Sequence, residues 1–329
     1  MIAPVKDGVH RTMWSVMIPV YNCSHYLKET LEAVLNQDMG PEVMQIEVVD
    51  DCSTDADVAQ LVLQIGQGRI DYYCQPMNVG SLRNFETCLN RSRGKYIHLM
   101  HGDDKVKDGF YSEMTKLFDM FPLAGAAFCA HEHIDMTGNI RVRKKPEADK
   151  PSILQNWLPK LAEAQRLQYI AIVVKRSVYE HLGGFYGVVY GEDWEMWARI
   201  AKHYPIAYTP ENLAQYREHD LSISNDSFIT GKNLQDIQTV IDIIITYLPE
   251  EDRKRIKSRA EKLYAYYSFN RRSYLWRLNK DIQPRHSYFL RLLKMHTDPK
   301  LLGKTIKLML IINMYNLKKI IRTIKTVQQ

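Results

Sequence analysis

Two hydrophobic periods alternate along the first hundred residues of the chain. Short apolar runs rich in β-branched residues, typical of buried strands, lie at residues 14–20, 45–49, 70–73 and 96–100. Between them, apolar side chains recur with the spacing of an amphipathic helix at residues 26–37, 58–67 and 81–91. This alternation predicts an α/β domain with a mostly parallel central sheet that helices cover on both faces.

The pattern changes in the second half of the chain. Residues 110–216 mix helical patterns with strands at 126–128 and 171–174, and residues 141–151 have the charge and proline typical of an exposed loop. Helical patterns then follow at residues 233–247, 250–270, 287–294 and 304–325. We therefore place a boundary near Ser224, between an α/β domain at residues 1–224 and a helical region at residues 225–329.

Polar side chains gather where the predicted strands end. Carboxylate or amide groups follow the carboxyl ends of four predicted strands, at Asn22, Asp50, Asp51, Asn78, Asp103 and Asp104. In open α/β sheets, ligands bind at that edge. The sequence therefore predicts a binding site there.

Asp103 and Asp104 have the chemistry of a cation site. Carboxylate oxygens are ligands that Mg²⁺ and Mn²⁺ prefer, and such ions take further ligands from phosphates and water. Gly102 followed by two aspartates is equally good turn chemistry, so a solvated turn is the alternative.

Asp51 lies in a second acidic loop and could accept a hydrogen bond from a base or a ribose. Three residues of the same loop could instead cap the helix that begins at Val58: Ser53, Thr54 and Asp55. The two roles are compatible, with Asp51 facing a ligand and Asp55 capping. Tyr21, at the end of the first strand, could stack on a nucleobase or simply pack against the protein.

Two adjacent carboxylates, Glu192 and Asp193, open a further helical pattern after a glycine-rich turn. Neighbouring residues on a helix do not share a face, so only one of the two can point into a given pocket. One carboxylate aimed at a substrate could serve as a general base. The alternative is that both acids only stabilise the positive end of the helix dipole.

Histidines give weaker signals. His131 and His133 alternate on a strand and so share a side, but no third ligand is spaced to match a zinc site. Arg217 and His219 offer a guanidinium for phosphate and an imidazole for a metal, or are structural residues near the boundary.

Composition narrows the possible classes. The chain has 329 residues, of which 45% are hydrophobic and 25% charged, as in soluble globular proteins. Five cysteines without a CxxC pair favour reduced thiols in a cytoplasmic protein, and no secretory signal or run of roughly 20 apolar residues is apparent. The sequence lacks Gly-x-Ser-x-Gly, Walker and Gly-x-Gly-x-x-Gly motifs, which counts against serine hydrolases, P-loop enzymes and ordinary dinucleotide dehydrogenases.

The C-terminal tail is basic and amphipathic. From residue 301 onward it has no acid but carries Lys304, Lys307, Lys318, Lys319, Arg322 and Lys325. Beside these cations runs an apolar helical stripe of Leu310, Met314, Leu317, Ile321 and Ile324. The cations could meet acidic lipid or nucleic acid, or only keep the protein soluble. The stripe either packs on its own helical region or on a second subunit, or it docks on the inner face of a membrane.

Five motifs, taken in order, resemble those of the family 2 glycosyltransferases, the large inverting group with the GT-A fold. They are Ile18-Pro19-Val20-Tyr21-Asn22, Val48-Val49-Asp50-Asp51-Cys52-Ser53-Thr54-Asp55, Asn78-Val79-Gly80 with Arg83-Asn84, His101-Gly102-Asp103-Asp104, and Gly191-Glu192-Asp193-Trp194. The resemblance covers residues 15–224, about two thirds of the chain.

The resemblance implies a nucleoside-diphosphate sugar donor, with a UDP-sugar favoured, and a divalent metal cofactor, Mn²⁺ or Mg²⁺. The donor-binding positions that it implies are Pro19, Tyr21, Asn22, Asp51, Asn78, Gly80, Arg83, His101, Gly102, Asp103 and Arg217. Tyr21 would lie against the base, Asp51 would hydrogen-bond it, and Asp103 and His219 would bind the metal. The chain has His101 where the family usually has an acid, and this nitrogen ligand would favour Mn²⁺.

The resemblance also implies the catalytic roles. Asp193 matches the general base that deprotonates the acceptor hydroxyl, while Glu192 and Trp194 would support it or contact the acceptor. We therefore expect an inverting transferase that acts on a glycan or lipid-linked acceptor in surface polysaccharide synthesis, without a nucleic-acid partner. The helical region would serve the acceptor, a homodimer or peripheral contact with the cell membrane. The alternatives are a non-catalytic nucleotide-sugar-binding scaffold and a nucleotidyltransferase, which would need a glycine- and basic-rich loop after the first strand.

Overall fold

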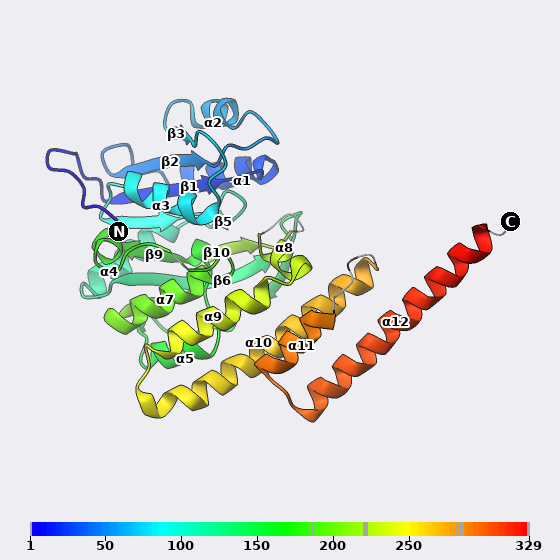
Figure 1. The fold of residues 1–329 in the computed structure, drawn as a ribbon. Helices are drawn as coiled ribbons and strands as arrows, with labels where there is room; N and C mark the ends of the chain where they lie inside the picture. Colours follow the sequence, from blue (N-terminus) through cyan, green and yellow to red (C-terminus); the bar gives the residue numbers. More distant parts are fainter. Residues whose placement is uncertain (1, 186, 220–222, 281, 283–285, 328–329) are drawn as a thin grey trace. The chain divides into compact units, whose positions relative to one another are not determined.

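The chain forms two compact units, Met1–Leu161 with Gln165–His219, and Ala162–Ala164 with Asp220–Gln329. The computed structural model describes residues 2–185, 187–219, 223–280, 282 and 286–327, except the side chains at 223–225, 320 and 322–327. The first unit is built around a sheet and the second is helical (Figure 1).

A ten-stranded sheet forms the centre of the first unit. Its strands are β1 (Trp14–Val20), β2 (Met44–Asp50), β3 (Asp71–Cys74), β4 (Tyr96–Leu99), β5 (Lys105–Val106), β6 (Ala126–Ile134), β7 (Ile140–Arg143), β8 (Ser152–Ile153), β9 (Ile172–Lys175) and β10 (Ile206–Arg217). The main path runs β3-β2-β1-β4-β9-β6-β10-β5, with β7 beside β6 and β8 beside β10. The strands β1 to β4 are parallel, as predicted, whereas β9 runs antiparallel to both β4 and β6, so the sheet as a whole is mixed.

Helices cover both faces of this sheet. They are α1 (Ser24–Leu35), α2 (Val58–Gly66), α3 (Ser81–Arg91), α4 (Phe110–Met120), α5 (Trp157–Glu163), α6 (Arg176–Leu182) and α7 (Glu192–His203), with the short 3-10 helix η1 (Tyr169–Ala171) before β9. Alternate residues of β1 enter two separate apolar layers, with Val16 and Ile18 in one and Met17 in the other. The first layer contains side chains of α1, α2 and α4, and the second those of α3, α5, α6 and α7. The predicted α/β architecture is therefore confirmed.

One expectation about the middle of the chain is wrong for residues 141–143, although residues 144–151 form no helix or strand, as expected. Residues 141–151 were expected to be a loop, but residues 140–143 form the strand β7, which pairs antiparallel with β6. All four residues of β7 are exposed. Charged residues are common on such edge strands because they discourage pairing with other chains, so the charge of this segment did not exclude a strand.

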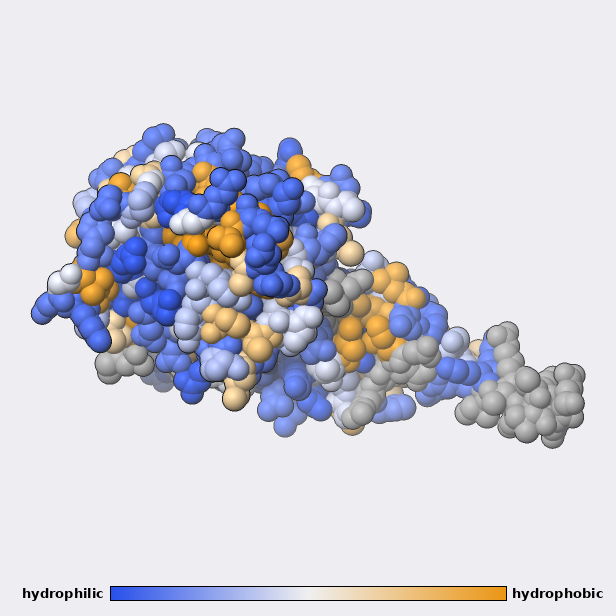
Figure 2. Space-filling view, turned by 90° about the horizontal axis from the view of Figure 1, so that it is seen from above, coloured by the Kyte–Doolittle hydropathy of each residue, from blue (hydrophilic) through white to orange (hydrophobic). Residues whose placement is uncertain are grey.

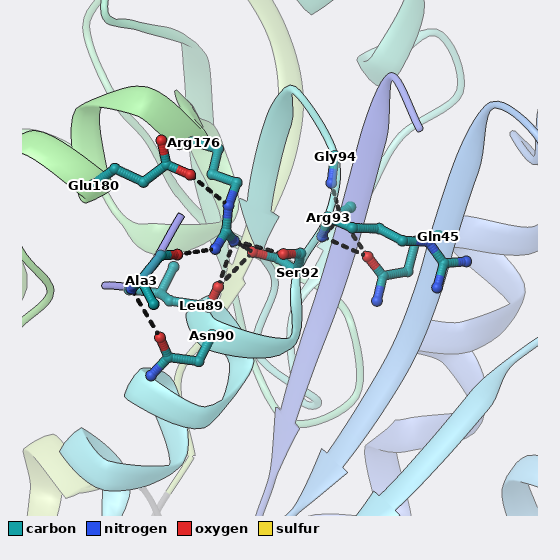
Figure 3. Close-up of polar contacts among 10 residues, drawn as sticks. Ala3, Gln45, Leu89, Asn90, Ser92, Arg93, Gly94, Arg176 and Glu180 are labelled. Atoms are coloured by element: carbon teal, nitrogen blue, oxygen red, sulfur yellow. Dashed lines mark hydrogen bonds and ion pairs between the residues drawn. The ribbon is translucent and has the colours of Figure 1, made fainter. Parts of the chain in front are cut away.

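A buried arginine joins the N-terminal segment to the end of α3 (Figure 3). The Arg176 guanidinium donates to the carbonyl oxygens of Ala3, Leu89 and Ser92 and pairs with Glu180 at 2.9 Å. Its side chain is only 1% exposed, and a charge so buried is tolerated because it is paired and hydrogen-bonded to several carbonyl oxygens. These contacts lie at the amino end of the sheet, away from the polar loops, so we assign Arg176 a structural role.

The second unit consists of helices. They are α8 (Ile223–Thr230), α9 (Asn233–Ile245), α10 (Glu250–Leu278), α11 (His286–Met295) and α12 (Pro299–Val327), of which α8 was not predicted. Its core includes Ile241 and Ile244 of α9 and Ile256 of α10, all fully buried. None of the helices, over the residues that the structure describes, is long and apolar enough to cross a membrane.

One of the two packing options for the C-terminal stripe is wrong. Leu310, Met314, Leu317 and Ile321 do not pack on their own helical region, because each is at least 44% exposed. The side chains of α12 that are buried lie on another face of the helix, at Leu301, Thr305, Leu308 and Ile312. Ile324 lies outside the described side chains.

Candidate active site

The polar loops predicted at the strand ends meet at one edge of the sheet. The Asn22 side-chain oxygen accepts a hydrogen bond from the Thr54 amide at 2.8 Å, which joins the loops after β1 and β2. The Gly102 amide donates to the Pro19 carbonyl at 3.3 Å, which joins the loop after β4. Gly102 allows this approach because a Cβ there would lie 2.9 Å from Val20 Cγ2. The edge is therefore one continuous set of bonded loops.

Asp51 holds the loop that leads into α3. Its two carboxylate oxygens accept the amides of Val79 at 2.7 Å and Gly80 at 3.0 Å. Burial raises the pKa of Asp51, although these two backbone hydrogen bonds oppose the rise. Gly80 has a φ of +83°, a backbone conformation that favours glycine. Because a carboxylate has about four acceptor positions, Asp51 keeps capacity for a further donor.

Three other predicted donor-binding residues are open to solvent at this edge. Tyr21 is 50% exposed, and Asn78 is exposed as well. The exposed Arg83 pairs with Glu86 at 2.7 Å. Such side chains are accessible to a ligand that binds over the loops.

The predicted cap of α2 is wrong. The cap is Asp57, whose side chain accepts the Gln60 amide at 2.9 Å. The predicted candidates were Ser53, Thr54 and Asp55. Asp55 instead accepts the amide of Ser24, the first residue of α1, at 2.9 Å. Asp55 reaches α1 because β1 and β2 are paired in the sheet, which brings the loops after them together. The local sequence does not contain this information.

Asp103 and His219, 116 residues apart, meet at the same edge. His219 Nε2 lies 2.8 Å from Asp103 Oδ2. Burial alone would raise the pKa of Asp103, but the hydrogen bond from His219 and the nearby His101 lower it overall. The other ring nitrogen of His219, Nδ1, is buried without a hydrogen-bond partner among the described residues. The structure thus brings together the two residues that the resemblance assigns to the metal.

Arg217 and Asp104 anchor the Asp103 loop through hydrogen bonds. The buried Asp104 carboxylate accepts the Arg217 amide at 2.8 Å, and burial together with the Asp103 charge raises its pKa well above the usual range. The Arg217 guanidinium donates to the Asp103 carbonyl at 2.8 Å and to Glu29 at 2.9 Å. Arg217 is 2% exposed, so the predicted phosphate contact would require it to leave these bonds.

His101 offers an unused nitrogen beside Asp103. Its ring is stacked on Phe85 at 5.2 Å between centroids and lies 4.4 Å from the ring of Tyr169. Burial lowers the pKa of His101, which keeps the imidazole neutral, and its Nε2 has no partner among the described residues. Ligand atoms of His101, Asp103 and Asp104 all lie within 4.8 Å of one another. Neutral imidazole and carboxylate together fit a divalent cation, and the nitrogen suits Mn²⁺ better than Mg²⁺.

Asp193 is a buried carboxylate at the start of α7. Its Oδ1 accepts the Trp194 amide at 2.8 Å, and its Oδ2 accepts a hydrogen bond from the Gln165 side chain. Burial raises the pKa of Asp193 to about 7. Trp194 is fully buried, and its indole donates a hydrogen bond to the Leu161 carbonyl. These contacts hold the start of α7 in place. A carboxyl group with a pKa near neutrality is suited to take up a proton during turnover.

Tyr169 connects the two parts of the site. Its hydroxyl donates to Glu192 at 3.2 Å, and its ring lies against His101. His101, Tyr169 and Glu192 therefore form a continuous chain from the Asp103 loop to the residue next to Asp193. Neither Tyr169 nor Gln165 was predicted from the sequence. Both lie just before β9, and only the antiparallel direction of β9 brings them to this edge.

His131 and His133 lie on one side of β6, as predicted, with ring centroids 5.6 Å apart. His133 Nδ1 lies 2.7 Å from a carboxylate oxygen of Glu218, and burial lowers the pKa of His131 to about 3. The pair is therefore part of the strand packing between β6 and β10.

Sequence comparison decides the family. The family described as Glycosyl transferase family 2 matches residues 15–183. The chain belongs to glycosyltransferase family 2. The matched range includes the loops of Asp51 and Asp103 but ends before Asp193 and His219.

Individual relatives match this chain over different lengths. An uncharacterized protein of Mycobacterium tuberculosis is 28% identical over 245 residues, which cover 70% of this chain and 75% of that protein. The minor teichoic acid biosynthesis protein GgaB of Bacillus subtilis is 33% identical over 110 residues, 32% of this chain and 12% of GgaB. The crystal structure of S. aureus TarS 1-349 in complex with UDP-GlcNAc superposes with a TM-score of 0.65 at 14% identity, over 90% of this chain and 81% of that one. This family 2 glycosyltransferase therefore has the predicted GT-A fold with a C-terminal helical region.

Proposed function

We propose that this enzyme transfers a sugar, with inversion, from a nucleoside-diphosphate sugar to a hydroxyl group of a glycan or lipid-linked acceptor. A UDP-sugar is the favoured donor and a cell-surface polysaccharide the favoured product. The observation that carries the proposal is the buried Asp193, with a pKa of about 7, joined to the Asp103 loop through Glu192, Tyr169 and His101. The UDP-GlcNAc complex of TarS and the teichoic acid role in the name of GgaB support the donor and product classes.

The proposed reaction is a single displacement. Asp193 takes the proton of the acceptor hydroxyl, and the acceptor oxygen forms a bond to the anomeric carbon. The bond from that carbon to the diphosphate oxygen breaks, and its electron pair leaves with the nucleoside diphosphate. A base of pKa near 7 is half ionised at neutral pH, which suits general-base catalysis. Attack opposite the leaving group inverts the configuration.

Asp103 and His219 would hold the divalent metal, with His101 Nε2 as a further nitrogen donor nearby. When bound, such a cation supplies positive charge to the leaving diphosphate. Arg217 and Asp104 keep the Asp103 loop in place. The metal would be Mn²⁺ or Mg²⁺, with Mn²⁺ favoured by the imidazole nitrogens.

The donor would lie over the edge formed by the loops after β1 to β4. Tyr21 is exposed for stacking on the base, and Asp51, which is 2% exposed, would accept a hydrogen bond from the base. We assign residues 1–224 to donor binding and catalysis, and residues 225–329 to the acceptor, to self-association or to a membrane surface. We also propose a cytoplasmic location, because the free cysteines of the chain suit a reducing compartment.

The direct test is nucleotide release by the full chain from a panel of nucleoside-diphosphate sugars, with Mn²⁺ or Mg²⁺ present. We expect slow release of UDP from at least one UDP-sugar even without an acceptor, because water can replace the hydroxyl. A donor that raises the melting temperature without any turnover would instead identify a binding scaffold. No response to any donor, in binding or turnover, would overturn the proposal.

Gln165→Leu should move the pH profile of the enzyme. The Gln165 side chain donates to Asp193 and thereby lowers the pKa of this carboxylate, so its loss raises that pKa further. Because the base must be ionised, we expect the acidic limb of kcat/KM to move to higher pH by about one unit, with the plateau at high pH retained. Gln155→Leu, at an exposed glutamine, is the matched control and should leave the profile unchanged. A uniform loss of activity at every pH would show that Gln165 has only a structural role.

A further inference from the structure

The helix α12 has a second apolar face that no part of the described chain covers. Its first face is buried through Leu301, Thr305, Leu308 and Ile312, beside α10 and α11. The other face carries an exposed stripe, which consists of Leu302, Ile306, Leu310, Met314, Leu317 and Ile321. These side chains are between 38% and 60% exposed and recur every three or four residues, so they line one side of the helix.

The surface in view in Figure 2 is mostly hydrophilic, with apolar residues gathered in a few patches, one of them on the helical unit. The exposed stripe runs over 20 residues of α12, from Leu302 to Ile321, which at the helical rise corresponds to roughly 28 Å. A stripe of this length is too extensive to be scattered surface apolarity and indicates an interaction surface.

Basic side chains flank the exposed stripe. Lys307 and Lys318 are exposed and, at about 100° per residue, lie roughly a quarter turn from the line of the stripe. Lys304, on the same flank, lies with its ammonium group 5.6 Å from the ring centre of Tyr266. The sequence from residue 299 to the end of the chain contains no acid. The face therefore joins an apolar stripe to a purely cationic flank.

This charge pattern decides between two occupants. A second copy of the chain that met this face with its own α12 would bring only cations, because the helix contains no acid, and so would offer the flanking lysines no anionic partner. An anionic lipid surface accepts both features, because the apolar stripe enters the headgroup boundary while the lysines contact the headgroups. The described helices cannot span a bilayer, so the helix would lie in the plane of the surface.

We propose that α12 docks the protein on the surface of an anionic lipid bilayer through the exposed stripe and its flanking lysines. The proposal stands apart from the proposed function, because vesicle binding requires no turnover. It would also bring the enzyme to the place where a lipid-linked acceptor lies.

Flotation of the full chain with vesicles tests this surface. We expect the protein to float with phosphatidylcholine vesicles that contain 30% phosphatidylglycerol, and much less with pure phosphatidylcholine. Leu310→Gln with Leu317→Gln should lower the partition coefficient at least about tenfold, since two apolar anchors are lost. Lys307→Gln with Lys318→Gln should lower it roughly 25-fold, because each lysine near an anionic surface contributes about fivefold.

The matched control is Leu63→Gln with Leu123→Gln, at two leucines of the first unit that are 58% and 83% exposed. It should bind vesicles as the unaltered chain does. All four stripe and flank positions are exposed, so circular dichroism should show folded variants. Equal binding to neutral vesicles, or binding that survives the Leu310 and Leu317 changes, would overturn the proposal. A dimer in solution that these changes dissociate, without vesicle binding, would assign the stripe to a second copy instead.

Discussion

Asp193→Asn should lower turnover by about 10²–10⁴-fold, because an amide cannot take the proton of the acceptor hydroxyl. Donor binding should be unchanged, since the amide oxygen can still accept the Trp194 amide and hold the start of α7 in place. The measurement is the rate of nucleoside diphosphate release at saturating donor, with calorimetry for the affinity. Glu192→Gln is the matched comparison and should cost much less, because Glu192 is bonded to Tyr169 and acts as support. The opposite ranking of the two variants would reassign the base to Glu192.

The same variant should change how the free energy of unfolding depends on pH. Burial raises the pKa of Asp193 from 3.8 to about 7, so the folded state favours the protonated form. This group therefore lowers stability progressively as pH rises from 3.8 to about 7, and its effect is constant above that. Asp193→Asn removes this dependence. We expect it to increase the free energy of unfolding at pH 8 by as much as about 4 kcal/mol, and by less at pH 5, in urea titrations. An equal effect at both pH values would show that Asp193 is not a buried acid of raised pKa.

Asp103→Asn should remove the metal dependence of the enzyme and lower turnover by at least about 10²-fold, because charge on the leaving diphosphate is no longer neutralised. Asn has nearly the same size, and the Asp103 carbonyl would still accept the Arg217 side chain, so the loop should keep its place. The measurement is turnover against Mn²⁺ concentration, with donor affinity determined at zero and saturating Mn²⁺.

Asp108→Asn provides the matched control for Asp103. Asp108 is an exposed aspartate that follows β5, five residues along the chain from Asp103. It should retain the metal response of the unaltered enzyme. If Asp103→Asn kept the same dependence on Mn²⁺, the metal would have to be held elsewhere, or the reaction would proceed without one.

Much of the fold could be predicted from the sequence, because its local patterns match its tertiary roles. The alternation of strand and helix periods predicted β1 to β4 and α1 to α3, and α3 spans the predicted residues 81–91. The polar loops at strand ends were predictable for the same reason, since adjacent parallel strands bring their carboxyl ends together. The resemblance then added residues that no pattern marks, such as His219.

The direction of β9 was beyond the reach of the sequence. An apolar strand has the same pattern whichever way it runs, yet only the antiparallel direction brings Gln165 and Tyr169 to Asp193 and Glu192. Long-range pairs were equally invisible. Nothing local to Arg217 indicates that its guanidinium holds the Asp103 carbonyl, 114 residues away. The sequence also predicted the helix α12, but it did not show which apolar face of α12 packs on the other helices.

Inverting catalysis by Asp193 is tested most directly by the configuration of the sugar that the enzyme releases from an α-linked UDP-sugar. Time-resolved ¹H NMR measures this configuration during hydrolysis. Water takes the place of the acceptor, so the acceptor need not be known. If Asp193 activates the nucleophile opposite the leaving diphosphate, the β-anomer appears first and converts to the α-anomer only by slow mutarotation, while Asp193→Asn releases sugar at least about 100-fold more slowly. The α-anomer appearing first, or release at the same rate by Asp193→Asn, would contradict the account.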